Sequence, residues 1–190
     1  MVERALVVSN TGKSIDYFMD VLNSAQINHI IGISTCGEAR HMLLEQEFGL
    51  VIINSPLKDE TGEKLSCNIA AKGISQVIFI VASEFYGPVS ARCENEGILT
   101  VSKPINKTAL WFAIKLAKTT QNKIMRMQEE NNRLKQKIED IRIIDKAKYI
   151  LISYLSMSEK EAHRYIEKQA MDIRVPKRTV AEGILKTYEN

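Results

Sequence analysis

Short apolar runs recur through the first hundred positions of the chain, and segments with helical spacing separate them. The runs are continuous rather than alternating, which is typical of strands that helices cover on both faces. Between the runs, apolar positions such as Ile15, Phe18 and Leu22 recur every three or four residues. The pattern predicts an α/β domain over residues 1–120, with five β-α repeats in a doubly wound, five-stranded parallel sheet. The predicted strands are Ala5–Val8, His29–Ile33, Leu50–Ile53, Val77–Ala82 and Ile98–Val101.

One long helix is predicted after Pro104, because residues 105–168 contain neither glycine nor proline. From Leu110 to Ile141 apolar positions alternate steps of three and four, the heptad pattern of a coiled coil. Packing of this stripe on the sheet competes with self-association, and the charged flanks favour a parallel homodimer through a coiled-coil linker, residues 110–142. The predicted dimer seam consists of Ile124, Met127, Asn131, Leu134, Ile138 and Ile141, where a buried Asn131 pair would fix two strands in one register.

Residues 143–190 are predicted to form a small three-helix domain. The long helix ends near Leu155, a second helix runs from about Ser158 to Ile173, and a third runs from Lys177 to Tyr188. Ser158 and Glu161 have the spacing of a capping box at the second helix. The expected core draws on Ile150, Leu151, Tyr154, Leu155, Ala162, Tyr165, Ile166, Ala170, Val180, Ala181 and Ile184. So few residues make a marginal core unless a larger framework supports it, and the long helix supplies that framework.

The amino-acid composition limits the classes of protein to which this chain can belong. The chain is 45% hydrophobic and 26% charged, as in soluble globular proteins. Its longest apolar run, Val77–Ala82, falls far short of the about 18 residues that span a bilayer, so we expect no membrane association. The three cysteines are not arranged in CxxC pairs, so we expect neither disulfides nor a zinc site. This cysteine usage is typical of a cytoplasmic protein. Basic and acidic residues number 11 and 12 up to residue 120 but 15 and 11 beyond it, so a polyanionic partner would favour the C-terminal part.

Ligands of doubly wound sheets bind beyond the carboxyl ends of the strands. The candidate site residues there are Ser9, Asn10, Asn54, Ala82, Ser83 and Lys103. No GxGxxG follows the first strand, and TGKS at positions 11–14 lacks the first glycine of a phosphate-binding loop. TGKS therefore indicates a helix start, and no cofactor is predicted.

The segment LVIINSPLKDETG, with VSKP at positions 101–104, resembles the receiver domain of bacterial response regulators. Leu57 and Gly62 keep the register of that family, whereas Lys58 replaces its usual proline. The resemblance implies that Asn54 stands at the phospho-acceptor aspartate. It also implies that Ser9 and Asn10 replace the acidic pair that holds magnesium, and that Lys103 keeps its identity.

An acyl-phosphate receiver needs an anionic nucleophile and carboxylates for a divalent cation. Asn54, Ser9 and Asn10 supply neither, so we expect a degenerate receiver with no metal and no phosphotransfer. The polar side chains are expected to end the strands and to hydrogen-bond to Lys103, and an anion or another ligand bound beside Lys103 is the alternative. A regulatory protein or ligand is the candidate partner of this domain. Asp59, in the following loop, is expected to be a turn residue.

The C-terminal segment resembles the ANTAR domain, an RNA-binding module of transcription antitermination regulators. The matching residues are Ala147 and Lys148, then Ser158, Glu161 and Ala162, then Ala170 and Met171, then Val180 and Ala181. Tyr149 departs from the glycine that many members have. The resemblance implies binding of paired stem-loops in nascent RNA, which prevents a terminator hairpin from forming.

The expected RNA-binding residues combine cations for phosphates with polar groups for loop bases. They are Ala147, Lys148, Arg164, Lys168, Gln169, Arg174, Lys177, Arg178 and Thr179. Tyr149, Tyr154 and Tyr165 are candidates for stacking on bases, although helical spacing favours core packing for Tyr154 and Tyr165. A DNA-binding response-regulator-like transcription factor is the alternative function, although the C-terminal helices lack a clear glycine turn. Catalysis is not expected, since His29, His41 and His163 are scattered and none lies at a strand end beside a nucleophile.

Overall fold

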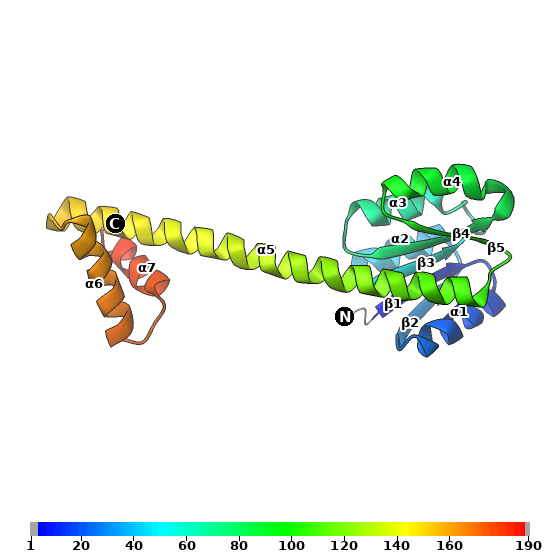
Figure 1. Cartoon of the computed structure of the whole chain (residues 1–190), viewed down its shortest axis with the longest axis horizontal. Helices are drawn as coiled ribbons and strands as arrows, with labels where there is room; N and C mark the ends of the chain where they lie inside the picture. The colour runs from blue at the N-terminus through cyan, green and yellow to red at the C-terminus, as the bar shows by residue number, and fades with distance from the viewer. Residues whose placement is uncertain (1–3, 189–190) are drawn as a thin grey trace. The chain divides into compact units, whose positions relative to one another are not determined.

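Five parallel strands and seven helices make up residues 4–188, the part of the chain that this computed structural model describes (Figure 1). The described chain forms two compact units, which divide between Arg126 and Met127. The strands are β1 (Arg4–Ser9), β2 (His29–Ile33), β3 (Leu50–Asn54), β4 (Gln76–Ala82) and β5 (Leu99–Lys103). The helices are α1 (Gly12–Ser24), α2 (Cys36–Glu45), α3 (Glu63–Ala71), α4 (Ser83–Asn95), α5 (Lys107–Leu155), α6 (Glu159–Asp172) and α7 (Lys177–Tyr188).

The first unit is a doubly wound sheet with the strand order β2-β1-β3-β4-β5, which confirms the predicted fold class. Helices α1 and α5 cover one face, and α2, α3 and α4 cover the other (Figure 1). All residues of β3 are buried, because this strand lies between two others and under helices on both faces. This burial on both faces explains why the strands are continuous apolar runs in the sequence.

Local sequence signals fix the start of several helices. Thr11 precedes α1, and its Oγ1 accepts a hydrogen bond from the Ser14 amide at 3.4 Å, so TGKS is a helix start as predicted. Gly62 precedes α3 with a φ of +87°, where a Cβ would lie 2.8 Å from the Ile53 side chain. Only glycine fits this turn without strain.

Helix α5 uses its apolar stripe in two ways. Leu110, Ile114 and Ala117 are fully buried against the sheet, so the first part of the heptad pattern packs on the first unit. Further along, the predicted seam is exposed, with exposed fractions of 61% at Met127, 52% at Leu134 and 58% at Ile141. The helix therefore leaves an apolar stripe without cover among the described residues of this single chain.

The second unit packs the end of α5 against α6 and α7 around a small core. Its centre consists of Ala147, Leu151, Ala162, Ile166 and Ala181. Ser158 and Glu161 form the predicted capping box at α6. The prediction that Tyr154, Leu155 and Tyr165 belong to the core is wrong, since all three side chains are exposed. Alanines at the centre let the helices approach closely, which leaves the large rings at the rim.

Candidate nucleic-acid interface

The strand ends of the first unit bring Ser9 and Asn54 together. Strands β1 and β3 place the two residues side by side in register. The Asn54 Nδ2 atom donates a hydrogen bond to Ser9 Oγ at 2.9 Å, and both side chains are buried. The Asn54 Oδ1 atom has no hydrogen-bond partner within residues 4–188. The pair is thus a neutral contact between neighbouring strands that leaves one buried acceptor unpaired within the described residues.

Lys103 lies beside this pair but takes a different partner from the one expected. Its Nζ atom donates to the Ser55 carbonyl oxygen, and burial lowers the pKa of Lys103 below its ordinary value. The expected hydrogen bond from Lys103 to the Ser9 and Asn54 side chains is not formed, since the Lys103 ammonium donates to the Ser55 backbone carbonyl instead. Ala82 pairs with Lys103 in register, and the next residue, Ser83, begins α4.

This donor set does not fit a magnesium ion. Mg²⁺ is usually held in proteins by at least one carboxylate. Ser9, Asn10 and Asn54 offer neutral oxygens only, and the nearby ammonium of Lys103 adds a positive charge. No chemical step through a metal follows from these residues.

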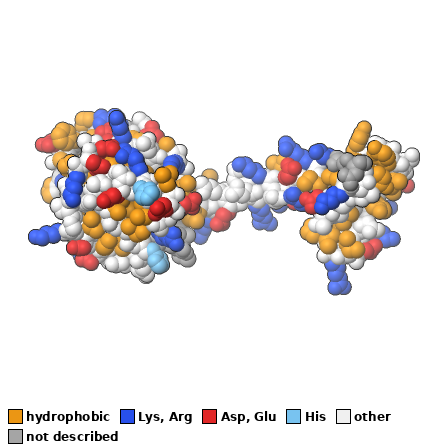
Figure 2. Space-filling model, turned by 180° about the vertical axis from the view of Figure 1, so that it is seen from behind, with side chains coloured by type: hydrophobic (Ala, Val, Ile, Leu, Met, Phe, Trp, Pro, Cys, Tyr) orange, Lys and Arg blue, Asp and Glu red, His pale blue; other side chains and the backbone are white. Residues whose placement is uncertain are grey.

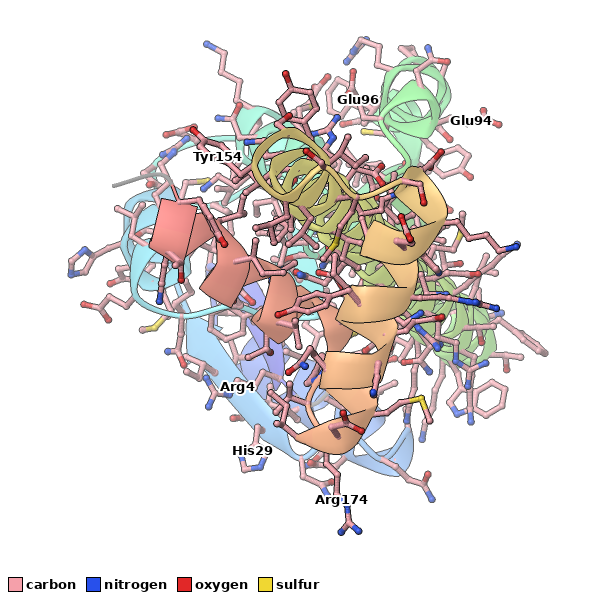
Figure 3. The ribbon with its side chains drawn as sticks, turned by 90° about the vertical axis from the view of Figure 1, so that its left-hand side faces the viewer. Arg4, His29, Glu94, Glu96, Tyr154 and Arg174 are labelled. Carbon is pink, nitrogen blue, oxygen red and sulfur yellow. The ribbon has the colours of Figure 1, made fainter. Side chains whose placement is uncertain are left out.

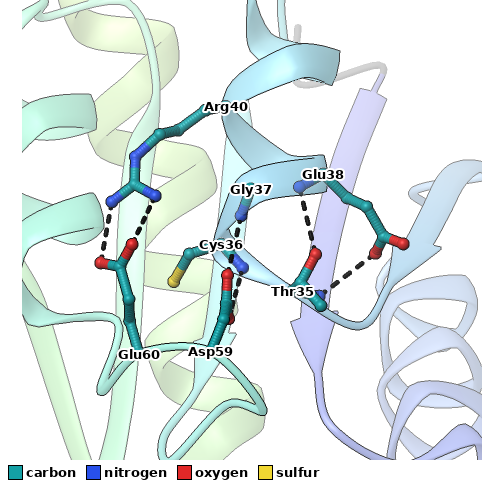
Figure 4. Close-up of polar contacts among 7 residues, drawn as sticks. All are labelled: Thr35, Cys36, Gly37, Glu38, Arg40, Asp59 and Glu60. Atoms are coloured by element: carbon teal, nitrogen blue, oxygen red, sulfur yellow. Dashed lines mark hydrogen bonds and ion pairs between the residues drawn. The ribbon is translucent and has the colours of Figure 1, made fainter.

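Asp59, the acidic residue of the loop after β3, is held at the start of α2 (Figure 4). Its two carboxylate oxygens accept hydrogen bonds from the backbone amides of Cys36, at 2.9 Å, and Gly37, at 3.0 Å. These bonds, first the one from Cys36, lower the pKa of the Asp59 carboxyl. The carboxylate caps the α2 N-terminus and is not free to replace a missing acid at the strand ends.

Cys36, Asp59 and Glu60 have ligand atoms within 4.8 Å of one another, yet their chemistry does not suit a metal. Glu60 forms a bidentate ion pair with Arg40, at 2.6 and 2.8 Å. Burial, and then the charges of Asp59 and Glu60, raise the pKa of the Cys36 thiol to about 11. A protonated thiol and two engaged carboxylates make a clamp between the loop and α2.

Three of the predicted RNA-binding cations form ion pairs inside the second unit. Lys148 contacts Asp145 at 2.7 Å and Glu159 at 3.5 Å, and its side chain is largely buried. Lys177 pairs with Glu167. Arg178 bridges two elements, since it contacts Asp140 of α5 and Glu182 of α7 at 2.8 and 2.7 Å. These contacts hold the three helices together.

Arg164, Lys168 and Arg174 are exposed and form no ion pair within residues 4–188. Arg164 and Lys168 lie one turn apart on α6 and line a hollow of about 390 Å³ that the end of α5 and the following turn also line. Tyr165 lines the same hollow. Arg174 lies in the connection between α6 and α7 and points to solvent (Figure 3). The sequence pattern favoured a core position for Tyr165, whereas the structure leaves its ring exposed between Arg164 and Lys168.

The remaining predicted RNA-binding residues differ in their exposure to solvent. Thr179 is exposed and Gln169 is half-buried. Ala147 is fully buried, so its predicted approach to loop bases is wrong. Its methyl group instead fills the centre of the helix crossing. Figure 2 shows Lys and Arg side chains beside hydrophobic ones on the surface of the second unit.

Comparisons with known proteins agree with this arrangement. Residues 132–185 match the ANTAR domain family. The fold of the first unit is that of receiver domains, such as the signal receiver domain of an HD domain-containing protein from Pseudomonas fluorescens Pf-5. That structure has a TM-score of 0.57 and 21% identity, over 65% of this chain and 91% of the other. The response regulator StyR aligns over 97% of this chain and 98% of its own, with a TM-score of 0.66 and 16% identity. Residues 132–185 are therefore an ANTAR domain, and they follow a domain with the receiver-type fold.

One curated relative is a transcriptional regulator. The transcriptional regulatory protein PdtaR of Mycobacterium tuberculosis is 27% identical over 138 residues, which are 73% of this chain and 67% of PdtaR. The protein is therefore similar to known regulators, and the ANTAR match makes it a transcriptional regulator of the ANTAR type. Among the described residues, no helix is long and apolar enough to cross a membrane.

Proposed function

We propose that this protein binds stem-loops in nascent RNA as a dimer and prevents a terminator hairpin from forming. The observation that carries the proposal is the hollow beside α6 in the ANTAR domain, where Arg164 and Lys168 lie without internal ion pairs around the exposed ring of Tyr165. Free cations attract phosphates, and an exposed ring offers a face on which an unpaired base stacks. The interface thus suits a folded RNA with an open loop.

The exposed stripe on α5 supports the dimer. Met127, Leu134, Ile138 and Ile141 repeat at heptad spacing and are each more than half exposed. A second copy of the same helix covers such a stripe in a parallel coiled coil, and the exposed Asn131 on the seam would pair with its counterpart. Two ANTAR domains would then contact two stem-loops at once, which raises the apparent affinity for paired hairpins.

The receiver-like domain has, in this proposal, no phosphotransfer role. The neutral pair Ser9–Asn54 and the clamped Asp59 supply no nucleophilic carboxylate at the strand ends. Its input would be a regulatory protein or another ligand. Because the proposed target is a transcript under synthesis, the protein would act in the cytoplasm.

The test is binding of the full chain to fluorescent RNA hairpins over a range of salt concentrations. Replacing Arg164 and Lys168 with Gln should weaken binding by about 10- to 100-fold and lower the salt slope by about one for each cation that contacts a phosphate. The matched control replaces Lys58 and Lys72, two exposed cations of the first unit, and should leave the affinity unchanged. No hairpin binding by the wild-type chain would refute the proposal.

One feature favours the alternative of a DNA-binding factor. Helices α6 and α7 are joined by residues 173–176, a turn of the length found in helix-turn-helix motifs, and Arg174 takes the left-handed conformation with a φ of 55°. The missing glycine therefore does not prevent such a turn. Competition of duplex DNA against hairpin RNA separates the two functions, and we expect duplex DNA to compete poorly.

A further inference from the structure

A second hollow on the ANTAR domain lies between α5 and the end of α7. Its volume is about 660 Å³, and it shares no residue with the hollow beside α6. We call it the tyrosine hollow. Its lining includes Tyr149, Tyr154, Tyr188, Ile150, Arg142 and Lys146.

The tyrosine hollow exposes two large rings. Tyr149 is 71% exposed and Tyr154 is 66% exposed. The Tyr154 ring packs against Tyr188 with a centroid distance of 5.5 Å, near the end of α7 (Figure 3). The Tyr149 ring contacts no other ring within residues 4–188. It therefore presents a flat apolar face beside a pair of rings that hold each other in place.

The charges around these rings favour an anionic occupant. Lys146 forms no ion pair within the described chain, and Arg142 has only a loose contact of 3.7 Å with the exposed Glu139. The one acid that lines the hollow, Asp145, is already paired with Lys148 at 2.7 Å. An apolar face with free cations at its edge is complementary to a nucleobase with its phosphate.

A second copy of the chain is a poorer occupant. The heptad steps of α5 continue from Ile141 to Asp145 and Lys148, so the apolar stripe ends before Tyr149. A partner helix would meet a charged pair at this level. The self-association seam and the tyrosine hollow are thus separate surfaces on α5.

We infer that the tyrosine hollow binds an unpaired nucleotide of the RNA, with the base stacked on Tyr149 and the adjoining phosphates near Lys146 and Arg142. This inference rests on the proposed function, since it needs an RNA with splayed loop bases. The tyrosine hollow would be a second RNA-contacting surface, in addition to the hollow beside α6. Stacking accepts any base, so the site adds affinity with little sequence preference.

The experiment uses the full chain and a hairpin in which 2-aminopurine, a fluorescent base, replaces one loop nucleotide at a time. Stacking on a tyrosine quenches its emission, so binding to the wild type should quench one loop position strongly. Tyr149→Ala should restore emission at that position and weaken affinity by about 5- to 100-fold, the loss that corresponds to one stacked base. Tyr149→Phe keeps the ring and should retain both quenching and affinity. Phe85→Ala removes a ring of the first unit that is 60% exposed and serves as the control.

The salt dependence of RNA binding distinguishes the contribution of the cations from that of stacking. Lys146→Gln should lower the salt slope by about one, whereas Tyr149→Ala should leave the slope unchanged. If the wild type binds hairpins and Tyr149→Ala binds them equally with the same quenching, the inference fails while the proposed function stands. If no hairpin binds, the proposed function fails first. A Tyr149→Ala chain with an altered monomer–dimer equilibrium would show that a second copy occupies the tyrosine hollow, which also overturns the inference.

Discussion

Replacing Leu134 with Lys tests the dimer seam most directly. Leu134 is 52% exposed in the single chain, so a partner helix would cover about half of its side chain. Full burial of a leucine contributes about 1.5–3 kcal/mol, and the remaining half is therefore about 1 kcal/mol per chain. The substitution removes this contribution from both copies and places two ammonium groups across the two-fold axis, which adds about 2 kcal/mol of repulsion and desolvation.

The sum, about 4 kcal/mol, predicts self-association about 1000-fold weaker than in the wild type. Sedimentation velocity over a concentration series measures the change. RNA affinity should fall in parallel, because a monomer loses the second ANTAR domain that dimerisation supplies at high effective concentration.

Asn132→Lys is the matched control for this substitution. It adds the same charge to an exposed position of α5, two residues away and thus on the other side of the helix. Its self-association should remain close to that of the wild type. A Leu134→Lys chain that dimerises and binds paired hairpins as the wild type does would refute the coiled-coil mechanism.

Four further outcomes are expected. Asp59→Ala should destabilise the chain by about 1–2 kcal/mol in urea unfolding at neutral pH. Because the pKa of Asp59 is lowered from 3.8, its contribution is present above that value and is lost as the pH falls through the lowered pKa, so wild type and variant should converge in acid. Gly62→Ala should cost about 2 kcal/mol by the same assay, from its left-handed φ and a close Cβ contact. Alkylation of the native protein at pH 8, followed by mass spectrometry, should modify the half-exposed Cys67 before the buried Cys36, whose thiol has a pKa of about 11. Incubation with acetyl phosphate should add no phosphate at Asn54, and a mass shift at that residue would contradict the proposed degenerate receiver.

The sheet could be predicted from the sequence because its signal is local and repeated. Each buried strand is a continuous apolar run, so the predicted bounds of His29–Ile33 agree with β2 and the others differ by one or two residues. The start of α6 was equally easy to predict, since the Ser158 capping box is a local pattern of four residues. The extent of the dimer seam was harder to predict. The heptad spacing of Leu110 and Ala117 does not show whether these residues pack on a partner helix or on the sheet.

The site depends on contacts between distant residues, which no local pattern contains. Asp59 meets the amides of α2 from 22 and 23 residues away, and nothing in the loop sequence marks it as a cap rather than a turn residue. Tyr154 has the helical spacing of a core residue. Its exposure follows from the alanines that bring three helices close together, which is a property of the whole packing.

The cations of the ANTAR domain show why a motif match does not reveal which basic residues are free to contact RNA. Lys148 lies inside a matched motif, yet its charge is used by Asp145 and Glu159 within the domain. Arg178 likewise joins α5 to α7. A phosphate would have to displace these carboxylates. Arg164 and Lys168 form no ion pair within the described chain, and Glu161, the acid that lines the same hollow, is hydrogen-bonded to Ser158. Residues that hold a small fold together are as recognisable in a motif as residues that bind RNA, and the two kinds separate only when the partner of each charge is known.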